Sequence, residues 1–236
     1  MKNKFLYSII GILSLSVITL GVFMVIILNK SNAKKVFDES VYSVVELKSS
    51  VGEDIISYGS AVFITDDGVL VTNAHMVTYK KTNKYLEFSN YEIRFSFEND
   101  FKKVSLLKYD INQDIAFLRL NSLENVTFRK INLGDSNKIS SGDIVYAIGN
   151  GMNHGIGITK GIISVPEVKI EYEDNIRDVI QADVIINEGN SGGALLNENG
   201  ALIGITTFRL KDNNANTIYG IAFCIPINIV LNYYEG

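Results

Sequence analysis

The sequence has few of the residues that build covalent cross-links and metal sites. It contains one cysteine, Cys224, and two histidines. A single cysteine excludes an internal disulfide, and its place in the apolar run Ile221–Ile225 indicates a buried small hydrophobe rather than a reactive thiol. Structural zinc sites use four such ligands, so two histidines and one cysteine do not predict one. We therefore expect neither a metal nor another cofactor.

A calcium loop is also incomplete. Asp110, Asn112 and Asp114 have the spacing with which such a loop begins. The pattern then requires a glycine, where this chain has Ile115, and a bidentate glutamate, where it has Asn121. We expect no calcium site in this segment.

Basic side chains are in the minority. The chain has 22 Lys and Arg against 26 Asp and Glu, a formal net charge of −4. Because nucleic-acid binding needs a basic face, this balance argues against a nucleic-acid partner.

Charge is absent from one long N-terminal run, Phe5 to Leu28. At ~1.5 Å per residue, a helix of this length crosses a ~30 Å hydrocarbon core. Residues 1–30 therefore predict a membrane anchor, with the body of the chain outside the cytoplasm. A cleaved signal peptide is the alternative, because Ser31-Asn32-Ala33 could serve as a cleavage site and the body would then be secreted.

Short apolar or alternating runs dominate the rest of the chain and predict β-strands. The predicted strands are Val41–Leu47, Gly59–Ile64, Val69–Val71, Ile93–Phe97, Val104–Leu107, Ile115–Leu120, Ile144–Ile148, Ile158–Ser164, Val168–Tyr172, Val179–Ala182, Ala194–Leu196, Leu202–Thr207 and Tyr219–Ile225. Asp67-Gly68 and Asn199-Gly200 mark hairpin turns. Strands this short and numerous indicate an all-β sandwich or barrels, and the polar stretch 121–130 divides the series in two. Helices are expected only at Ile227–Tyr234 and around Ala33–Glu39.

A glycine-rich turn carries the strongest chemical signal. In the segment 187–193, Ser191 stands between glycines, with apolar runs on both sides. Three glycines suit a serine nucleophile, whose backbone must curl tightly and direct N–H groups at a developing oxyanion. A simple turn serine is the alternative.

Two partners for such a serine lie upstream. His75 follows the predicted strand 69–71, and Asp114 opens the strand 115–120. The order His, Asp, Ser is that of chymotrypsin-like enzymes. His75 could instead be a core histidine, and Asp110 competes with Asp114 for the role of the acid. His154 is expected in a solvated loop.

These residues belong to a longer series of ordered motifs. The series is Gly59-Ser60, Thr72-Asn73-Ala74-His75, Asp110 with Asp114-Ile115-Ala116, Leu133-Gly134-Asp135-Ser136, Gly142-Asp143, Ala147-Ile148-Gly149-Asn150, Gly161-Ile162-Ile163-Ser164, Gly189-Asn190-Ser191-Gly192-Gly193 and Gly220-Ile221-Ala222-Phe223-Cys224-Ile225-Pro226. In this series the chain resembles trypsin-like serine proteases of the HtrA/Deg type.

The resemblance implies a fold of two six-stranded antiparallel β-barrels with the site between them. The barrels would span residues 36–125 and 126–236, the second ending in a short helix. It also implies that Ser191 is the nucleophile, His75 the general base and Asp114 the residue that orients the imidazole. The backbone N–H groups of Gly189 and Ser191 would form the oxyanion hole.

The resemblance further implies polypeptide substrates. The specificity pocket would be lined by Ile185, Ile186 and the strand segment Tyr219, Gly220 and Ile221. In trypsin an aspartate lies six residues before the nucleophile; Ile185 is at that position here, which predicts cleavage after small or medium apolar residues. Substrates would be exposed or misfolded proteins outside the cytoplasm. A catalytically silent peptide-binding or chaperone-like module on the same fold is the alternative.

Some family features are altered or open. Glu188 stands where relatives often have proline, Asn150-Gly151-Met152 replaces a common Asn-Pro-Phe, and Ala61 replaces a frequent glycine. The sequence ends at Gly236, where most relatives continue into PDZ domains, so we expect the PDZ-lacking form. The family often forms trimers through the protease domain, which makes a homotrimer an expectation of the resemblance alone.

Overall fold

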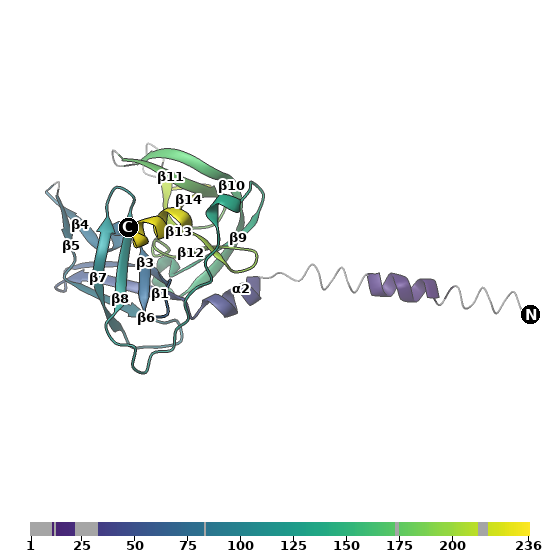
Figure 1. Cartoon of the computed structure of the whole chain (residues 1–236), viewed down its shortest axis with the longest axis horizontal. Helices are drawn as coiled ribbons and strands as arrows, with labels where there is room; N and C mark the ends of the chain where they lie inside the picture. Colours follow the sequence, from purple (N-terminus) through teal and green to yellow (C-terminus); the bar gives the residue numbers. More distant parts are fainter. Residues whose placement is uncertain (1–10, 12, 22–32, 83, 173–174, 212–216) are drawn as a thin grey trace, which may run out of the picture. The chain divides into compact units, whose positions relative to one another are not determined.

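Two closed six-stranded antiparallel barrels make up the body of the protein (Figure 1). The computed structural model describes residues 11, 13–21, 33–82, 84–172, 175–211 and 217–236. Residues 33–236 form one compact unit, and the described residues before it belong to a separate one. The predicted all-β fold with two six-stranded barrels is confirmed.

The first barrel uses six of the first eight strands, in the spatial order β1-β2-β3-β8-β7-β6. Its strands are β1 (Val44–Val51), β2 (Ile55–Phe63), β3 (Val69–Thr72), β6 (Asn90–Arg94), β7 (Lys102–Asp110) and β8 (Ile115–Leu120). Strands β2 and β3 meet at the predicted Asp67-Gly68 turn, where Gly68 has a φ of +83° that favours glycine. Asp114 therefore lies at the start of β8, and His75 just beyond the end of β3.

The second barrel has the spatial order β10-β11-β14-β13-β12-β9. Its strands are β9 (Ile144–Gly149), β10 (Gly157–Tyr172), β11 (Asn175–Ala182), β12 (Ala194–Asn197), β13 (Leu202–Lys211) and β14 (Thr217–Pro226). Ser191 lies in the turn that enters β12. The sequence predicted two strands, Ile158–Ser164 and Val168–Tyr172, where the structure has the single strand β10. Its pairing with β11 shifts register twice between Ile163 and Val168, around Pro166, which cannot donate to a ladder.

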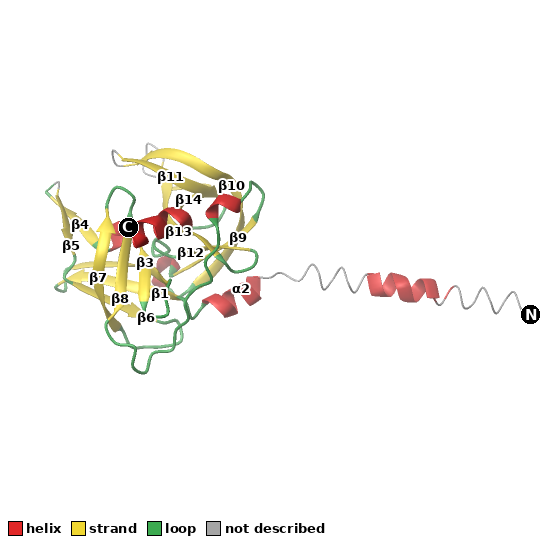
Figure 2. Ribbon diagram, viewed as in Figure 1, coloured by secondary structure: helices red, strands yellow, loops and turns green. Residues whose placement is uncertain are grey.

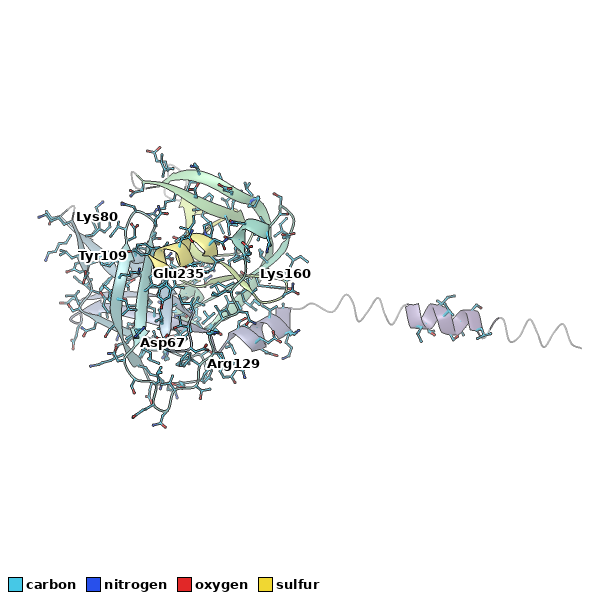
Figure 3. The ribbon with its side chains drawn as sticks, in the orientation of Figure 1. Asp67, Lys80, Tyr109, Arg129, Lys160 and Glu235 are labelled. Carbon is cyan, nitrogen blue, oxygen red and sulfur yellow. The ribbon has the colours of Figure 1, made fainter. Side chains whose placement is uncertain are left out.

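A short hairpin between the barrel strands was not predicted. It consists of β4 (Thr78–Lys81) and β5 (Lys84–Glu87), and it begins two residues after η1 (Ala74–Met76), the 3₁₀ turn that holds His75. Tyr79 packs against the core of the first barrel, but neither strand has an alternating apolar face. Figure 3 shows Lys80 on this hairpin.

The remaining helices flank the barrels (Figure 2). They are α2 (Ala33–Ser40), α3 (Ile227–Glu235) and the 3₁₀ turns η2 (Ser136–Lys138) and η3 (Gly151–Asn153). Helix α3 begins directly after Pro226, whose fixed φ suits a helix start, and both predicted helices are confirmed. Figure 3 labels Glu235 at the end of α3.

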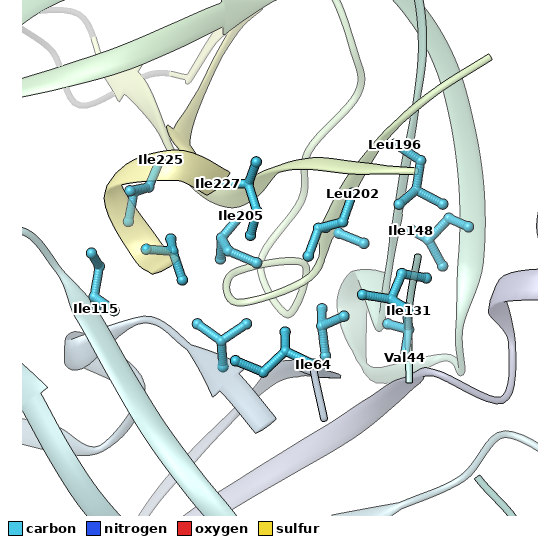
Figure 4. Packing of buried hydrophobic residues seen from close by; sticks show 14 of the residues in the cluster. Val44, Ile64, Ile115, Ile131, Ile148, Leu196, Leu202, Ile205, Ile225 and Ile227 are labelled. Atoms are coloured by element: carbon cyan, nitrogen blue, oxygen red, sulfur yellow. The ribbon is translucent and has the colours of Figure 1, made fainter. Parts of the chain in front are cut away.

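One hydrophobic cluster joins the two barrels (Figure 4). Val44 and Ile115 of the first barrel share it with Ile148 and Ile205 of the second, and Ile227 of α3 completes it. These side chains are at most 2% exposed. Burying a side chain of this size contributes roughly 1.5–3 kcal/mol, so the shared core fixes one barrel against the other.

The predicted anchor, residues 1–30, lies mostly outside the described residues. Of this segment Gly11 and residues 13–21 are described, as helix. Among all residues that the structure describes, no helix is both long and apolar enough to span a membrane.

Candidate active site

His75 and Asp114 are in direct contact. Nδ1 of His75 lies 2.9 Å from both carboxylate oxygens of Asp114, and the backbone N–H of His75 donates to Oδ1 over 3.0 Å. An ionised carboxylate can only accept, so Nδ1 carries the proton and Nε2 of the neutral ring is left as an acceptor. The His75 side chain is 45% exposed, whereas that of Asp114 is 5% exposed. A buried anion thus fixes the Nδ1 edge of the imidazole, while part of the ring is exposed to solvent.

The loop before β8 separates the roles of the two aspartates. Asp110 accepts the backbone N–H groups of Asn112 and Gln113 through Oδ1, as in an Asx turn. Asp114 takes the left-handed conformation with φ +58°, and its carbonyl accepts from the side-chain amide of Asn73. Asp114, the aspartate that the resemblance implied, therefore contacts His75, whereas its competitor Asp110 holds the turn.

Asp114 stays ionised in spite of its burial. Burial is the largest single effect and raises the pKa of this carboxyl. The electrostatic interaction with His75, its two hydrogen bonds and the Thr207 hydroxyl together outweigh burial, so the pKa of Asp114 lies below its ordinary value. A permanent negative charge beside the imidazole stabilises the imidazolium form.

The turn around Ser191 needs its glycines for space as well as for conformation. Gly189 has φ +92°, and a Cβ at this position would lie 2.1 Å from the carbonyl oxygen of Asn150. At Gly192, with φ +82°, a Cβ would lie 2.2 Å from the carbonyl oxygen of Ser60. No L-residue with a side chain fits either position without displacement of the backbone.

Ser60 of β2 ties this turn to the first barrel. Its N–H donates to the carbonyl of Ser191 over 2.8 Å, and its hydroxyl donates to the carbonyl of Gly189 over 2.8 Å. The same hydroxyl accepts the N–H of Asn150. The serine turn is thereby fixed from both barrels.

Thr207 of β13 links the serine to the aspartate. Oγ of Ser191 donates to the carbonyl of Thr207 over 2.8 Å, and the Thr207 hydroxyl donates to Oδ2 of Asp114 over 2.7 Å. Since a hydroxyl has one proton, that of Ser191 is directed at Thr207 in this structure.

Two backbone N–H groups of the turn are available to a ligand. Within the described part of the chain, the N–H groups of Gly189 and Ser191 have no acceptor. The carbonyl of Glu188 accepts from the N–H of Met152 over 2.6 Å. Because a trans peptide points its C=O and N–H in opposite directions, the Gly189 N–H faces away from Met152. The Glu188 side chain is exposed.

The predicted pocket residues lie in different environments. Ile185 is 60% exposed, whereas Ile186 is 2% exposed and belongs to the core of the second barrel. Gly220 is exposed with φ +77°, Ile221 is half-buried, and the side chain of Tyr219 lies outside the described residues. Ile185 and Gly220 thus have exposed surface, whereas Ile186 belongs to the core.

Sequence reasoning missed Thr207 and passed over the role of Ser60. Thr207 is 2% exposed and Ser60 is 0% exposed, and both lie in strands with many buried apolar residues. Since buried hydroxyls require partners, a polar residue within such a run was the available signal.

A family model described as a trypsin-like peptidase domain matches residues 59–205 of this chain. The periplasmic serine endoprotease DegP of Escherichia coli (strain K12) is 36% identical over 181 residues, covering 76% of this chain and 35% of that protein. DegP of Salmonella typhimurium (strain LT2) gives the same identity, 36% over 181 residues, and the same coverage of 76% and 35%. The chain therefore spans about a third of the length of these curated relatives.

Solved structures give the same result. The structure described as the HtrA-type protease AlgW with a tripeptide superimposes with a TM-score of 0.73 at 30% identity. The match covers 86% of this chain and 62% of AlgW.

Proposed function

Because the chain belongs to the trypsin-like peptidases of the HtrA type, we propose that it is a serine endopeptidase. Its catalytic residues would be His75, Asp114 and Ser191, and it would hydrolyse peptide bonds through an acyl-enzyme intermediate. The observation that carries the proposal is the imidazole of His75 fixed through Nδ1 by the buried carboxylate of Asp114, which Thr207 links to Ser191 in the glycine turn.

The chemistry begins with a change at Ser191. Its hydroxyl must turn from the carbonyl of Thr207 toward Nε2 of His75, which is left as an acceptor by the tautomer that Asp114 selects. Oγ then attacks the peptide carbonyl carbon while the proton passes to Nε2. The imidazolium returns this proton to the leaving amine, and a water molecule repeats both steps on the acyl-enzyme.

The N–H groups of Gly189 and Ser191 would stabilise the oxyanion of the tetrahedral intermediate. Their freedom from other acceptors within the described residues supports this role, and so does the peptide orientation held by Met152. One such donor is typically worth about 3 kcal/mol of transition-state stabilisation.

The substrates would be exposed or misfolded proteins outside the cytoplasm, cleaved after small or medium apolar residues. The relatives are named periplasmic endoproteases, and exposed Ile185 offers apolar surface beside the serine turn. We assign the charge-free run 5–28 to a single-pass membrane anchor on its sequence, with secretion after cleavage as the alternative. N-terminal sequencing of the mature protein and membrane fractionation decide between these two. Light scattering of the body tests the homotrimer.

One observation favours a second candidate, a catalytically silent peptide-binding module. The Ser191 hydroxyl is bonded to the Thr207 carbonyl, an arrangement that a silent protein could keep permanently. The two candidates differ in whether Ser191 becomes nucleophilic.

A fluorophosphonate probe separates them, since it reacts with an activated serine. We expect the folded wild-type protein to label, and Ser191→Ala and His75→Ala to remain unlabelled. Ser141→Ala is the matched control, because Ser141 is an exposed serine bonded to the carbonyl of Ser164, and it should label like wild type. Folded wild-type protein that stays unlabelled while a related protease labels would support the silent module instead.

A further inference from the structure

An arginine occupies a core-facing position in strand β11. Arg177 is 5% exposed and has the same alternation as buried Val179, so it points inward where an apolar side chain is expected. Arginine is almost never this deeply buried unless its charge and its donors are matched by partners.

Two backbone acceptors of Arg177 come from the other barrel. Its Nε donates to the carbonyl of Asn112 over 2.7 Å, and its Nη2 donates to the carbonyl of Ile111 over 3.0 Å. These two residues lie in the loop between β7 and β8, which ends at Asp114. The planar guanidinium fork therefore holds two consecutive carbonyl groups of the loop that presents the Asp114 carboxylate.

This loop has a conformation that needs support. Asp114 has φ +58°, a left-handed conformation that is unfavourable for residues with a side chain, and the preceding turn is tight. Asp110 satisfies N–H groups of Asn112 and Gln113 from one side, while Arg177 satisfies the carbonyls from the other. Both sets of bonds involve an ionised group, the Asp110 carboxylate as acceptor or the Arg177 guanidinium as donor, and such bonds are about twice as strong as neutral ones.

The same side chain also acts on the charge of the site. Nη1 of Arg177 lies 3.8 Å from Oδ2 of Asp114, the oxygen that receives the Thr207 hydroxyl. Among the residues that the structure describes, His75 from η1 and Arg177 from β11 form ion pairs with this carboxylate. Arginine keeps its proton in proteins, so it can orient Asp114 but cannot replace His75 as the base.

We propose that Arg177 is a positioning residue for the peptidase reaction: from the second barrel it fixes the 111–114 loop and thereby the bond between Asp114 and His75. The expected effect on catalysis rests on the proposed function, whereas the effect on the bond between Asp114 and His75 does not.

The kinetic test uses Arg177→Met, which keeps much of the volume, and Arg177→Lys, which keeps the charge but loses the fork. With a short peptide substrate and rates expressed per Ser191 titrated by an active-site reagent, we expect Arg177→Met to lower kcat about 10- to 100-fold with KM little changed. Arg177→Lys should fall between Arg177→Met and wild type, since the ammonium keeps the charge but lacks the planar fork that matches two consecutive carbonyls.

The matched control is Arg119→Met. Arg119 lies in β8 and forms a surface ion pair with Asp67, where its side chain is 47% exposed. Its removal should leave kcat within about twofold of wild type. A purely structural role of Arg177 would reduce the titrated fraction and leave the rate per site unchanged. A per-site kcat of Arg177→Met or Arg177→Lys equal to wild type would overturn the proposal.

A second readout does not depend on turnover. In proton NMR of the resting protein, the Nδ1 proton of His75 reports its bond to Asp114, and His154 is the only other histidine. We expect this resonance to shift or broaden in both variants while that of His154 stays in place. An unchanged Nδ1 resonance in the variants would refute the positioning role. A wild-type protein without peptidase activity would instead refute the proposed function, and the NMR comparison would still decide the role of Arg177.

Discussion

The Thr207 hydroxyl donates a hydrogen bond to Oδ2 of Asp114 over 2.7 Å, so a residue of the second barrel binds a carboxylate of the first. The same residue accepts the Ser191 hydroxyl through its carbonyl. Thr207 thus touches two of the three proposed catalytic residues, which lie 93 and 16 positions away in the sequence. This contact makes the orientation of Asp114 depend on the assembly of both barrels.

Removal of the Thr207 hydroxyl should impair the reaction more than the fold. In Thr207→Val the buried Oδ2 loses a donor, and an acceptor left short of a partner typically costs about 1–3 kcal/mol. We expect kcat/KM for a peptide substrate to fall about 10-fold, because Asp114 is held less firmly. Thr207→Ser keeps the hydroxyl and should retain most of the activity. A loss of activity in Thr207→Ser together with full activity in Thr207→Val would assign the effect to packing of the methyl group instead.

The depressed pKa of Asp114 predicts a dependence of stability on acid. A carboxyl with a pKa lower in the folded than in the unfolded state binds fewer protons when folded, so its contribution is complete above the unfolded pKa of about 4. That contribution is lost as the pH falls through the lower folded pKa. Urea denaturation across this acid range should therefore show a steeper loss of stability in wild type than in Asp114→Asn. Parallel curves for the two proteins would contradict the assignment.

Gly189→Ala should abolish most peptidase activity, because it displaces a donor of the proposed oxyanion hole. The new Cβ would lie 2.1 Å from the Asn150 carbonyl oxygen, so the peptide that carries the Gly189 N–H must move. Loss of this donor predicts a fall in kcat of about 100- to 1,000-fold.

Gly200→Ala is the matched control for backbone strain. Gly200 has a similar φ of +80°, but the nearest atom to a Cβ there is 3.9 Å away. This variant should lose about 1 kcal/mol of stability and keep its activity. Similar activities of the two alanine variants would exclude a role for the Gly189 peptide in catalysis.

Cys224 should be unreactive until the protein unfolds. It is the only cysteine, it is fully buried, and burial strongly raises the pKa of its thiol. We expect a chromogenic disulfide reagent to modify no thiol in the native protein and one thiol per chain in concentrated urea. Rapid modification of native protein would mean that the second barrel opens around β14.

Much of the fold was predictable because its strands are local patterns. Runs such as Ile115–Leu120 and the Asp67-Gly68 turn appear in the structure where the sequence predicts them. The β4–β5 hairpin was missed because it lacks an alternating apolar face, and β10 was divided in two because its bulge at Pro166 interrupts the pattern. Both failures occur where a strand is held by pairing rather than by burial of alternate residues.

The sequence predicted the three central residues of the candidate site but not the residues that hold them in place. His75, Asp114 and Ser191 stand in recognisable motifs, and the structure joins the first two directly and links the third through Thr207. Arg177 gave only a weak signal, an arginine with the alternation of a buried strand residue. The two carbonyl groups to which it donates are 65 and 66 positions away, so no local pattern could identify them.

The sequence by itself determined the chemistry available to this protein, namely a serine in a glycine turn, a histidine after one strand and an aspartate before another. These are fixed by residue identity and short-range periodicity, which act within a few positions of the chain. Only the tertiary structure decided that Asp114 binds the Nδ1 side of His75 while Asp110 holds the preceding turn, and that the Glu188 carbonyl turns toward Met152. It also decided that Thr207 and Arg177 of the second barrel hold Asp114. The physical reason is that these choices are hydrogen bonds between segments which become neighbours only when two barrels close around one shared core.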